Sequence, residues 1–221
     1  MTIGHRPPCP PDSPPRVAGR RDDTTDAPLD GPALQALEAE LPALARIRRF
    51  AAAAARIDWL GHVGEHPGPK TMDMAERYID ALGFPDARVA LVTDWAEAAA
   101  AAETLDFDSA AWEAEEQLRA ALTTDALAQV SEEALSVALT HVAAEVNAPI
   151  RSSIEEALAI WDEPGDAMLD LAVGSAVQAC HHGALVLAAQ TEEDHPFALK
   201  FRLFEAGRWP IGVAGLSFNL F

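Results

Sequence analysis

The sequence predicts a mainly α-helical, bundle-like globular fold with a short β-hairpin at the C-terminus. Two observations predict it. Apolar side chains recur at spacings of three and four residues along 30–190, the period of amphipathic helices, and a segment with large aromatic side chains follows from residue 196. Hydrophobic residues make up 49% of the chain and charged residues 23%, which is ordinary for a folded protein. We therefore expect one α-helical domain over residues 30–221, with the aromatic segment 196–221 packed on its helices.

The N-terminal residues 1–29 are expected to stay outside this domain. They hold seven prolines and only three large aliphatic side chains. Such a segment buries too little apolar surface to offset the entropy lost on ordering it, so it predicts a disordered or polyproline-like tail. It also lacks an apolar core of signal-peptide length.

The first helices are expected on either side of a loop rich in glycine and proline. One should run from about 32 to 60, kinked or split at Pro42 and ended by Gly61. The next is expected over 71–82, where a glycine and then a proline follow.

The middle of the chain is expected to be helical throughout. Asp86 and Asp108 can each cap a helix, the first continuing through Val89 and Trp95 into a run of alanines. A further helix should begin near residue 124 or 131 and end at 147, before Pro149.

Another helix is expected to open at Ser152, because Ser152 and Glu155 have the spacing of a capping box. The most apolar helix should then span about 166–190. Its apolar side chains fall within one arc of roughly 100°, the width of a core-facing stripe, which makes it the expected central helix.

Two interpretations compete for 197–204, because its apolar residues fit both an alternating strand and one face of a helix. We favour the helix, since Pro196 is a suitable start and Gly207 a suitable stop. Residues 209–213 and 216–221 are expected to form the two strands of the hairpin, which must lie against the helices to be stable.

The net charge of −19 is concentrated in the middle of the chain, where residues 92–170 hold 18 Asp and Glu against only Arg119 and Arg151. Such a surface repels nucleic acids and anionic membranes and attracts basic partners. We therefore expect neither nucleic-acid nor membrane binding. The arginines between 46 and 56 are interpreted as the solvated face of a helix.

This acidity favours an interaction protein, an inhibitor or immunity-type partner of a basic protein. The expected partner-binding residues are Arg208 and Trp209, in the distinctive GRWPIG string, with Glu113 and Glu116 of the acidic middle. A scaffold or assembly subunit, including a homo-oligomer built through the C-terminal segment, is an alternative hypothesis.

The other alternative is an enzyme or a protein that binds a small molecule or metal through His181, His182 or His195, near the C-terminal aromatic residues. His141 and Glu145 are four residues apart on an expected helix and share its face, so with His181 and His195 they are the candidate ligands of a divalent metal. Hydrogen-bonded or solvated histidines explain the same pattern. No catalytic residue and no cofactor is predicted, because nucleophile and phosphate-binding motifs are lacking.

The only two cysteines, Cys9 and Cys180, fall in the expected tail and in the apolar helix. A disulfide would have to tie a mobile segment to a buried position, so both are expected to be free thiols. Free thiols are typical of a reducing compartment, and we expect a cytoplasmic protein.

Overall fold

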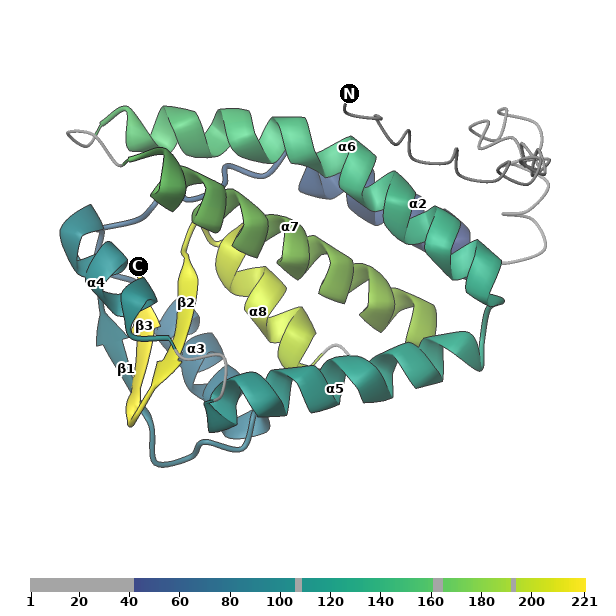
Figure 1. Cartoon of the computed structure of the whole chain (residues 1–221), viewed down its shortest axis with the longest axis horizontal. Coiled ribbons are helices and arrows are strands. Elements are labelled where there is room, and N and C mark those ends of the chain that lie inside the picture. The colour runs from purple at the N-terminus through teal and green to yellow at the C-terminus, as the bar shows by residue number, and fades with distance from the viewer. Residues whose placement is uncertain (1–41, 106–108, 161–164, 192–193) are drawn as a thin grey trace, which may run out of the picture.

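The computed structural model describes residues 42–105, 109–160, 165–191 and 194–221, and the expected tail lies outside these ranges. The described residues form seven helices and a three-stranded sheet (Figure 1). The fold is thus mainly α with a short C-terminal β element, as the sequence predicts. In chain order the elements are α2 (Pro42–Ala54), α3 (Pro69–Ala81), β1 (Arg88–Leu91), α4 (Trp95–Glu103), α5 (Ala110–Leu127), α6 (Glu132–Leu158), α7 (Asp166–Ala189), α8 (Pro196–Glu205), β2 (Pro210–Ala214) and β3 (Ser217–Leu220).

Helix α7 is the central helix that the apolar stripe predicts. It crosses the middle of the molecule and packs against α2, α5, α6 and α8 (Figure 1). Its segment Ala167–Ala189 is also long and apolar enough to span a membrane, and 61% of the apolar window is buried inside the protein. The core helix of a soluble protein meets the same criteria. The stripe residues Val173, Ala176, Cys180 and Ala184 are buried.

Helix α8 and the hairpin confirm the predictions for the chain end, and the sheet adds a third strand. Strand β3 lies in the centre, antiparallel to β2 and parallel to β1. The helix expected after Asp86 is therefore wrong at residues 88–91, which form β1. The following helix, α4, begins after Asp94, whose side chain accepts a hydrogen bond from the Glu97 backbone N–H at 2.9 Å.

Helix α2 ends at Ala54, earlier than the expected end near residue 60. The indole N–H of Trp59 donates to the Ala54 carbonyl at 3.0 Å, so a side chain from beyond the helix satisfies one of its last carbonyls. Leu60 then takes a φ of 60°, a left-handed conformation that turns the chain away.

Helix α6 runs through Pro149 without ending, so the stop at 147 and the new start at Ser152 are both wrong. Its cap is Ser131, whose side chain accepts from the Ala134 backbone N–H at 3.2 Å. Val146, Ile150 and Ile154 are fully buried and continue one apolar stripe across the proline. Because α6 packs against both α2 and α7, this burial outweighs the backbone hydrogen bond that proline cannot make.

Candidate functional site

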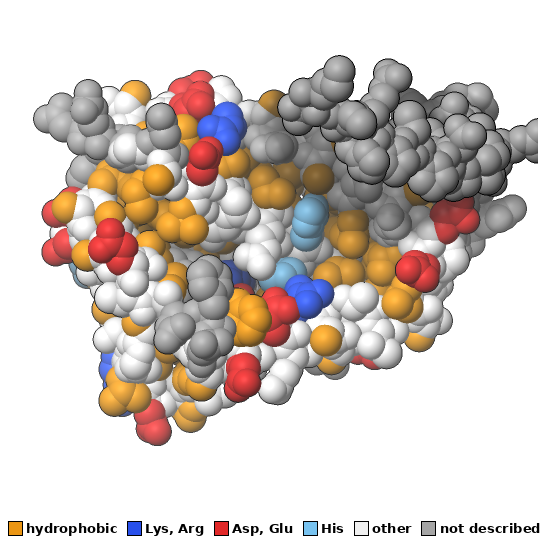
Figure 2. Space-filling model, viewed as in Figure 1, with side chains coloured by type: hydrophobic (Ala, Val, Ile, Leu, Met, Phe, Trp, Pro, Cys, Tyr) orange, Lys and Arg blue, Asp and Glu red, His pale blue; other side chains and the backbone are white. Residues whose placement is uncertain are grey.

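A cleft of about 400 Å³ is bordered by α5, α7 and β2, and the end of α4, Leu82 after α3 and one residue of α8 complete its lining. Figure 2 looks onto this face, where the surface is hollowed between α5 and α7. Most of the lining is apolar. The polar side chains that line it are Ser109, Glu115, Glu116, Asp170, Ser175, Gln178 and Lys200. A mostly apolar cleft with polar groups at particular positions is typical of small-molecule sites.

Helix α5 supplies one wall, with residues that helical spacing places on neighbouring turns of one face. It begins after Ser109, whose hydroxyl oxygen accepts from the Trp112 backbone N–H at 3.2 Å. Asp108, the expected cap, lies outside the described residues. Trp112 is 44% exposed at the cleft, and Leu171 of α7 is 46% exposed there. Two large apolar side chains thus stay open to solvent around the cleft.

A charged network of three residues, the Glu115 network, adjoins the cleft. Lys200 of α8 donates to both carboxylate oxygens of Glu115, at 2.7 and 2.8 Å, and the Tyr78 hydroxyl of α3 donates to one of them at 2.5 Å. Lys200 is only 9% exposed and Tyr78 is fully buried. The network therefore joins three helices, and two of its members, Glu115 and Lys200, line the cleft.

The network is ionised at Glu115 and neutral at Tyr78. Burial alone would raise the pKa of Glu115, but the charge of Lys200 and the hydrogen bonds from Lys200 and Tyr78 hold that pKa below its ordinary value. Burial, together with the adjacent carboxylate, raises the pKa of Tyr78 well above its usual range. At neutral pH the cleft thus carries a Lys⁺–carboxylate pair.

His182 of α7 lies near this network and is 3% exposed. Its ring stacks on Phe197, with the ring centroids 3.9 Å apart. Burial lowers the pKa of His182 to about 4, and the positive charge of Lys200 acts in the same direction. The imidazole is therefore neutral at pH 7, and among the residues described its buried Nδ1 atom has no hydrogen-bond partner.

The C-terminal residues form the opposite wall. Trp209 is 1% exposed, and its indole N–H donates to the Ser175 hydroxyl at 3.3 Å. Its ring centroid lies 5.7 Å from that of Trp95, which also packs edge-on against Phe221. The aromatic chain end is thus packed into the core, and Trp209 lines the cleft although its side chain is almost fully buried.

The four residues expected to bind a partner are in different surroundings. Trp209 and Glu116 line the same cleft, and Glu116 is paired with Arg119 at 2.6 Å. Arg208 is buried, and its guanidinium donates to the Glu65 carbonyl. Glu113 is exposed in the first turn of α5. The structure brings two of the four together at the cleft and does not bring the other two there.

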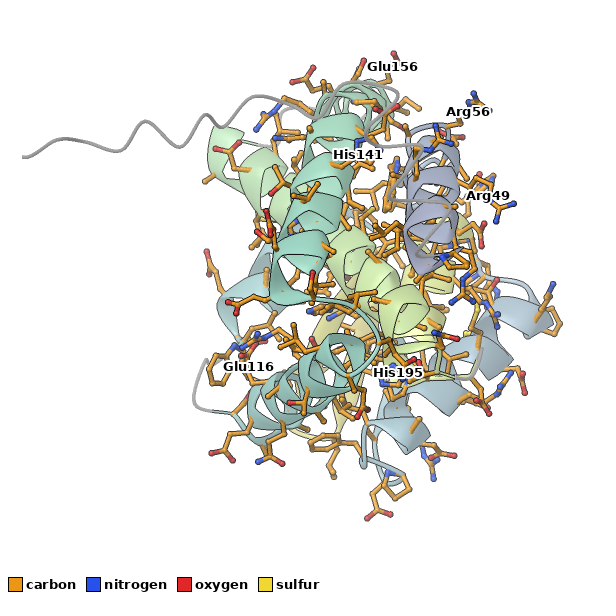
Figure 3. All side chains as sticks on the ribbon, turned by 90° about the vertical axis from the view of Figure 1, so that its right-hand side faces the viewer. Arg49, Arg56, Glu116, His141, Glu156 and His195 are labelled. Atoms are coloured by element: carbon orange, nitrogen blue, oxygen red, sulfur yellow. The ribbon has the colours of Figure 1, made fainter. Side chains whose placement is uncertain are left out.

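The expected metal ligands are not gathered. Figure 3 shows His141 on α6 and His195 at the start of α8, far apart in the molecule. His195 caps α8, because its ring nitrogen accepts from the Phe197 backbone N–H at 3.2 Å. Glu145 is exposed, and His181 is half-buried on α7. Within the described ranges, no three His, Cys, Asp or Glu side chains are placed to hold one metal ion.

Comparisons of this chain with protein-family models, with curated proteins and with solved structures find no match. The cleft is therefore the feature of this chain that indicates a function.

Sequence reasoning named Glu116 and Trp209 but missed Tyr78, Lys200 and Trp112 as site residues. Two signals were available. Lys200 is the one charged residue in the otherwise apolar segment from Phe197 to Phe201. Tyr78 is the only tyrosine of the chain.

Proposed function

We propose that this protein binds a small organic molecule in the cleft between α5, α7 and β2. The observation that carries the proposal is the combination of an apolar cleft of about 400 Å³ with a buried ion pair that opens into it. That volume suits a small organic ligand, whose apolar body would lie against Trp112, Leu171 and Trp209.

The Glu115 network supports a binding role because burying its charged groups costs free energy that an apolar interior would not. Removing two charges from water costs several kcal/mol per ion, and apolar residues of similar size often stabilise a fold as well or better. Glu115 and Lys200 have side chains 20% and 11% exposed, so both are largely desolvated. A pair of this kind beside an open cleft is well placed to orient a polar group.

The exposed apolar side chains support the same role. Trp112 and Leu171 are among the few large hydrophobic residues in the described ranges that are more than a third exposed, and both line the cleft. A bound ligand would shield apolar surface of each side chain from water. Burial of this kind contributes about 25 cal/mol per Å² to the free energy of binding.

A cleft-blocking variant, Gly174→Leu, tests the proposal. A side chain added at Gly174 on α7 would meet no atom within 4 Å at its Cβ, so it extends into open space where Gly174 lines the cleft. The full chain should bind the neutral apolar dye N-phenyl-1-naphthylamine with increased fluorescence, and Gly174→Leu should weaken that binding about ten-fold or more. Ala144→Leu, on the exposed side of α6, is the matched control.

The proposal fails if Gly174→Leu and Ala144→Leu bind the dye as the parent protein does while all three stay folded by circular dichroism. Binding lost equally in both variants would also contradict it, because a change on α6 away from the cleft should have no effect.

The interaction with a basic partner stays a prediction. It expects a contiguous acidic face, and the face in Figure 2 carries its acidic side chains in separate small groups around the hollow. The scaffold hypothesis and the homo-oligomer built through the C-terminal segment likewise stay predictions.

A further inference from the structure

We propose that the cleft selects a ligand whose polar end is an uncharged, planar amide-type group, and that this end binds the Glu115–Lys200 pair. The inference rests on the proposed function and names the chemical class of the ligand. Carboxamides, lactams and ureas belong to this class, because each offers a hydrogen-bond acceptor and a donor side by side.

The Glu115–Lys200 pair leaves hydrogen-bonding positions open. A lysine ammonium has three N–H donors, and two of them go to the two oxygens of Glu115. Among the described residues, no further hydrogen-bond acceptor is bound by Lys200. Glu115 accepts two of its hydrogen bonds at Oε1 and one at Oε2, so Oε2 keeps an acceptor site.

These open positions lie next to each other. Lys200 Nζ and Glu115 Oε2 are 2.8 Å apart, so adjacent oxygen and nitrogen atoms of one planar ligand group can contact both. A ligand oxygen can accept from Lys200 while the neighbouring ligand N–H donates to Glu115. Both hydrogen bonds involve a charged protein group, so they are stronger than bonds between neutral groups.

The charges at the cleft also favour a neutral ligand group. Lys200 and Glu115 neutralise one another, so a charged ligand group placed on them would be buried without a counter-ion. The other two carboxylates at the cleft are also paired, Glu116 with Arg119 at 2.6 Å and Asp170 with Arg151 at 2.8 Å. Neither an anion nor a cation therefore finds an unpaired partner among these groups.

Helix α7 forms a further wall of the cleft and offers uncharged polar groups there. The Ser175 hydroxyl accepts from Trp209 and keeps its own hydrogen to donate, and the Gln178 amide is exposed at the cleft. Donors and acceptors of this kind complement a neutral polar group better than a charged one. The aromatic lining then receives the rest of the ligand.

Three probes with the same naphthalene body and different polar ends test the inference: 2-naphthamide, 2-naphthoate and 2-naphthylmethylammonium. Their binding to the full chain is measured by the shifts of the tryptophan indole signals in NMR spectra. The amide should bind about ten-fold tighter than either charged probe, the effect expected of one hydrogen bond to a charged group. Gly174→Leu should abolish these shifts.

A double variant, Glu115→Gln with Lys200→Met, tests the role of the pair. Replacing both residues avoids leaving one charge buried alone, which is the reason that a single replacement could unfold the chain. If the pair binds the amide group, this variant keeps the apolar cleft and binds 2-naphthamide about ten-fold more weakly, whereas its binding of the apolar dye N-phenyl-1-naphthylamine stays unchanged. Unchanged binding of 2-naphthamide by the folded double variant overturns the inference.

The outcomes separate the two proposals. If a charged probe binds as tightly as the amide and Gly174→Leu removes its binding, the cleft is a ligand site and the amide inference is wrong. If neither these probes nor N-phenyl-1-naphthylamine shows binding that Gly174→Leu removes, the inference and the proposed function both fail.

Discussion

His182 stays neutral in the folded protein, and this gives the stability a defined pH dependence. Burial, with the nearby charge of Lys200, lowers the pKa of His182 to about 4 from an ordinary 6.5. In the unfolded chain the imidazole regains the ordinary pKa, so between these two values the unfolded state binds more protons than the folded state. Stability is therefore complete above pH 6.5 and falls as the pH drops toward 4.

His182→Phe should remove this contribution while keeping an aromatic ring stacked on Phe197. The parent protein should lose about 2 kcal/mol more free energy of unfolding than the variant between pH 7 and pH 5, as measured by urea denaturation. His181 and His195 act in the same direction, because burial lowers both pKa values, so the comparison is between variant and parent. Equal losses in the two proteins would show that His182 is not the group responsible.

The site shows which residues a sequence can reveal. His181 and His182 attract notice because imidazoles are unusual in an apolar helix, and His182 does lie near the Glu115 network. Lys200 can be recognised as a site residue only from its ion pair with Glu115, which lies 85 positions away along the chain. No local pattern records such a pairing, so the ion pair could not have been predicted from spacing alone.

At the scale of elements, the packing of α2 against α7 depends on a glycine. A Cβ atom at Gly183 would lie 2.7 Å from the ring tip of Phe50, whereas at Gly174 of the same helix it would meet nothing within 4 Å. Alanine is favoured over glycine in a helix by about 1 kcal/mol at either position. At Gly183 the steric conflict with Phe50 opposes this gain in stability, and at Gly174 nothing opposes it.

We expect Gly174→Ala to raise the free energy of unfolding by about 1 kcal/mol, and Gly183→Ala to lower it by about 1 to 2 kcal/mol because Phe50 must shift. Urea denaturation of both variants beside the parent protein measures the difference. A higher free energy of unfolding in both variants would mean that Phe50 moves aside freely and that α2 and α7 are loosely packed.

Some helices and strands can be predicted from local sequence features, and others depend on residues far away in the chain. Helices α3, α7 and α8 follow from periodicity and from start and stop residues, which are local features. Strand β1 was missed because it is stabilised by parallel pairing with β3, from Arg88 with Ser217 to Leu91 with Leu220, more than a hundred residues later. The helix break at Pro149 was predicted from a local rule, and tertiary burial overrides it.

The charge of the whole molecule is the property that the sequence predicts most directly. Figure 3 shows Arg49 and Arg56 along α2 and just after it, Glu156 at the same end of the molecule as Arg56, and Glu116 toward the other end. Because 35 Asp and Glu outnumber 16 Lys and Arg, giving a net charge of −19, negative charge stays in excess however the ion pairs form. Like charges on one compact molecule repel, and this repulsion is relieved when the chain unfolds and expands.

Salt should therefore stabilise the protein. Raising NaCl from 0.1 to 1 M shortens the screening length from about 10 Å to about 3 Å, which weakens the long-range repulsion more than the close ion pairs. We expect Tm to rise by several degrees, measured by circular dichroism at pH 7. The double variant Glu155→Lys with Glu156→Lys, on exposed residues near the C-terminal end of α6, should melt higher at low salt and respond less to NaCl. A Tm that falls with salt in the parent protein would show that attractive pairs dominate its electrostatics.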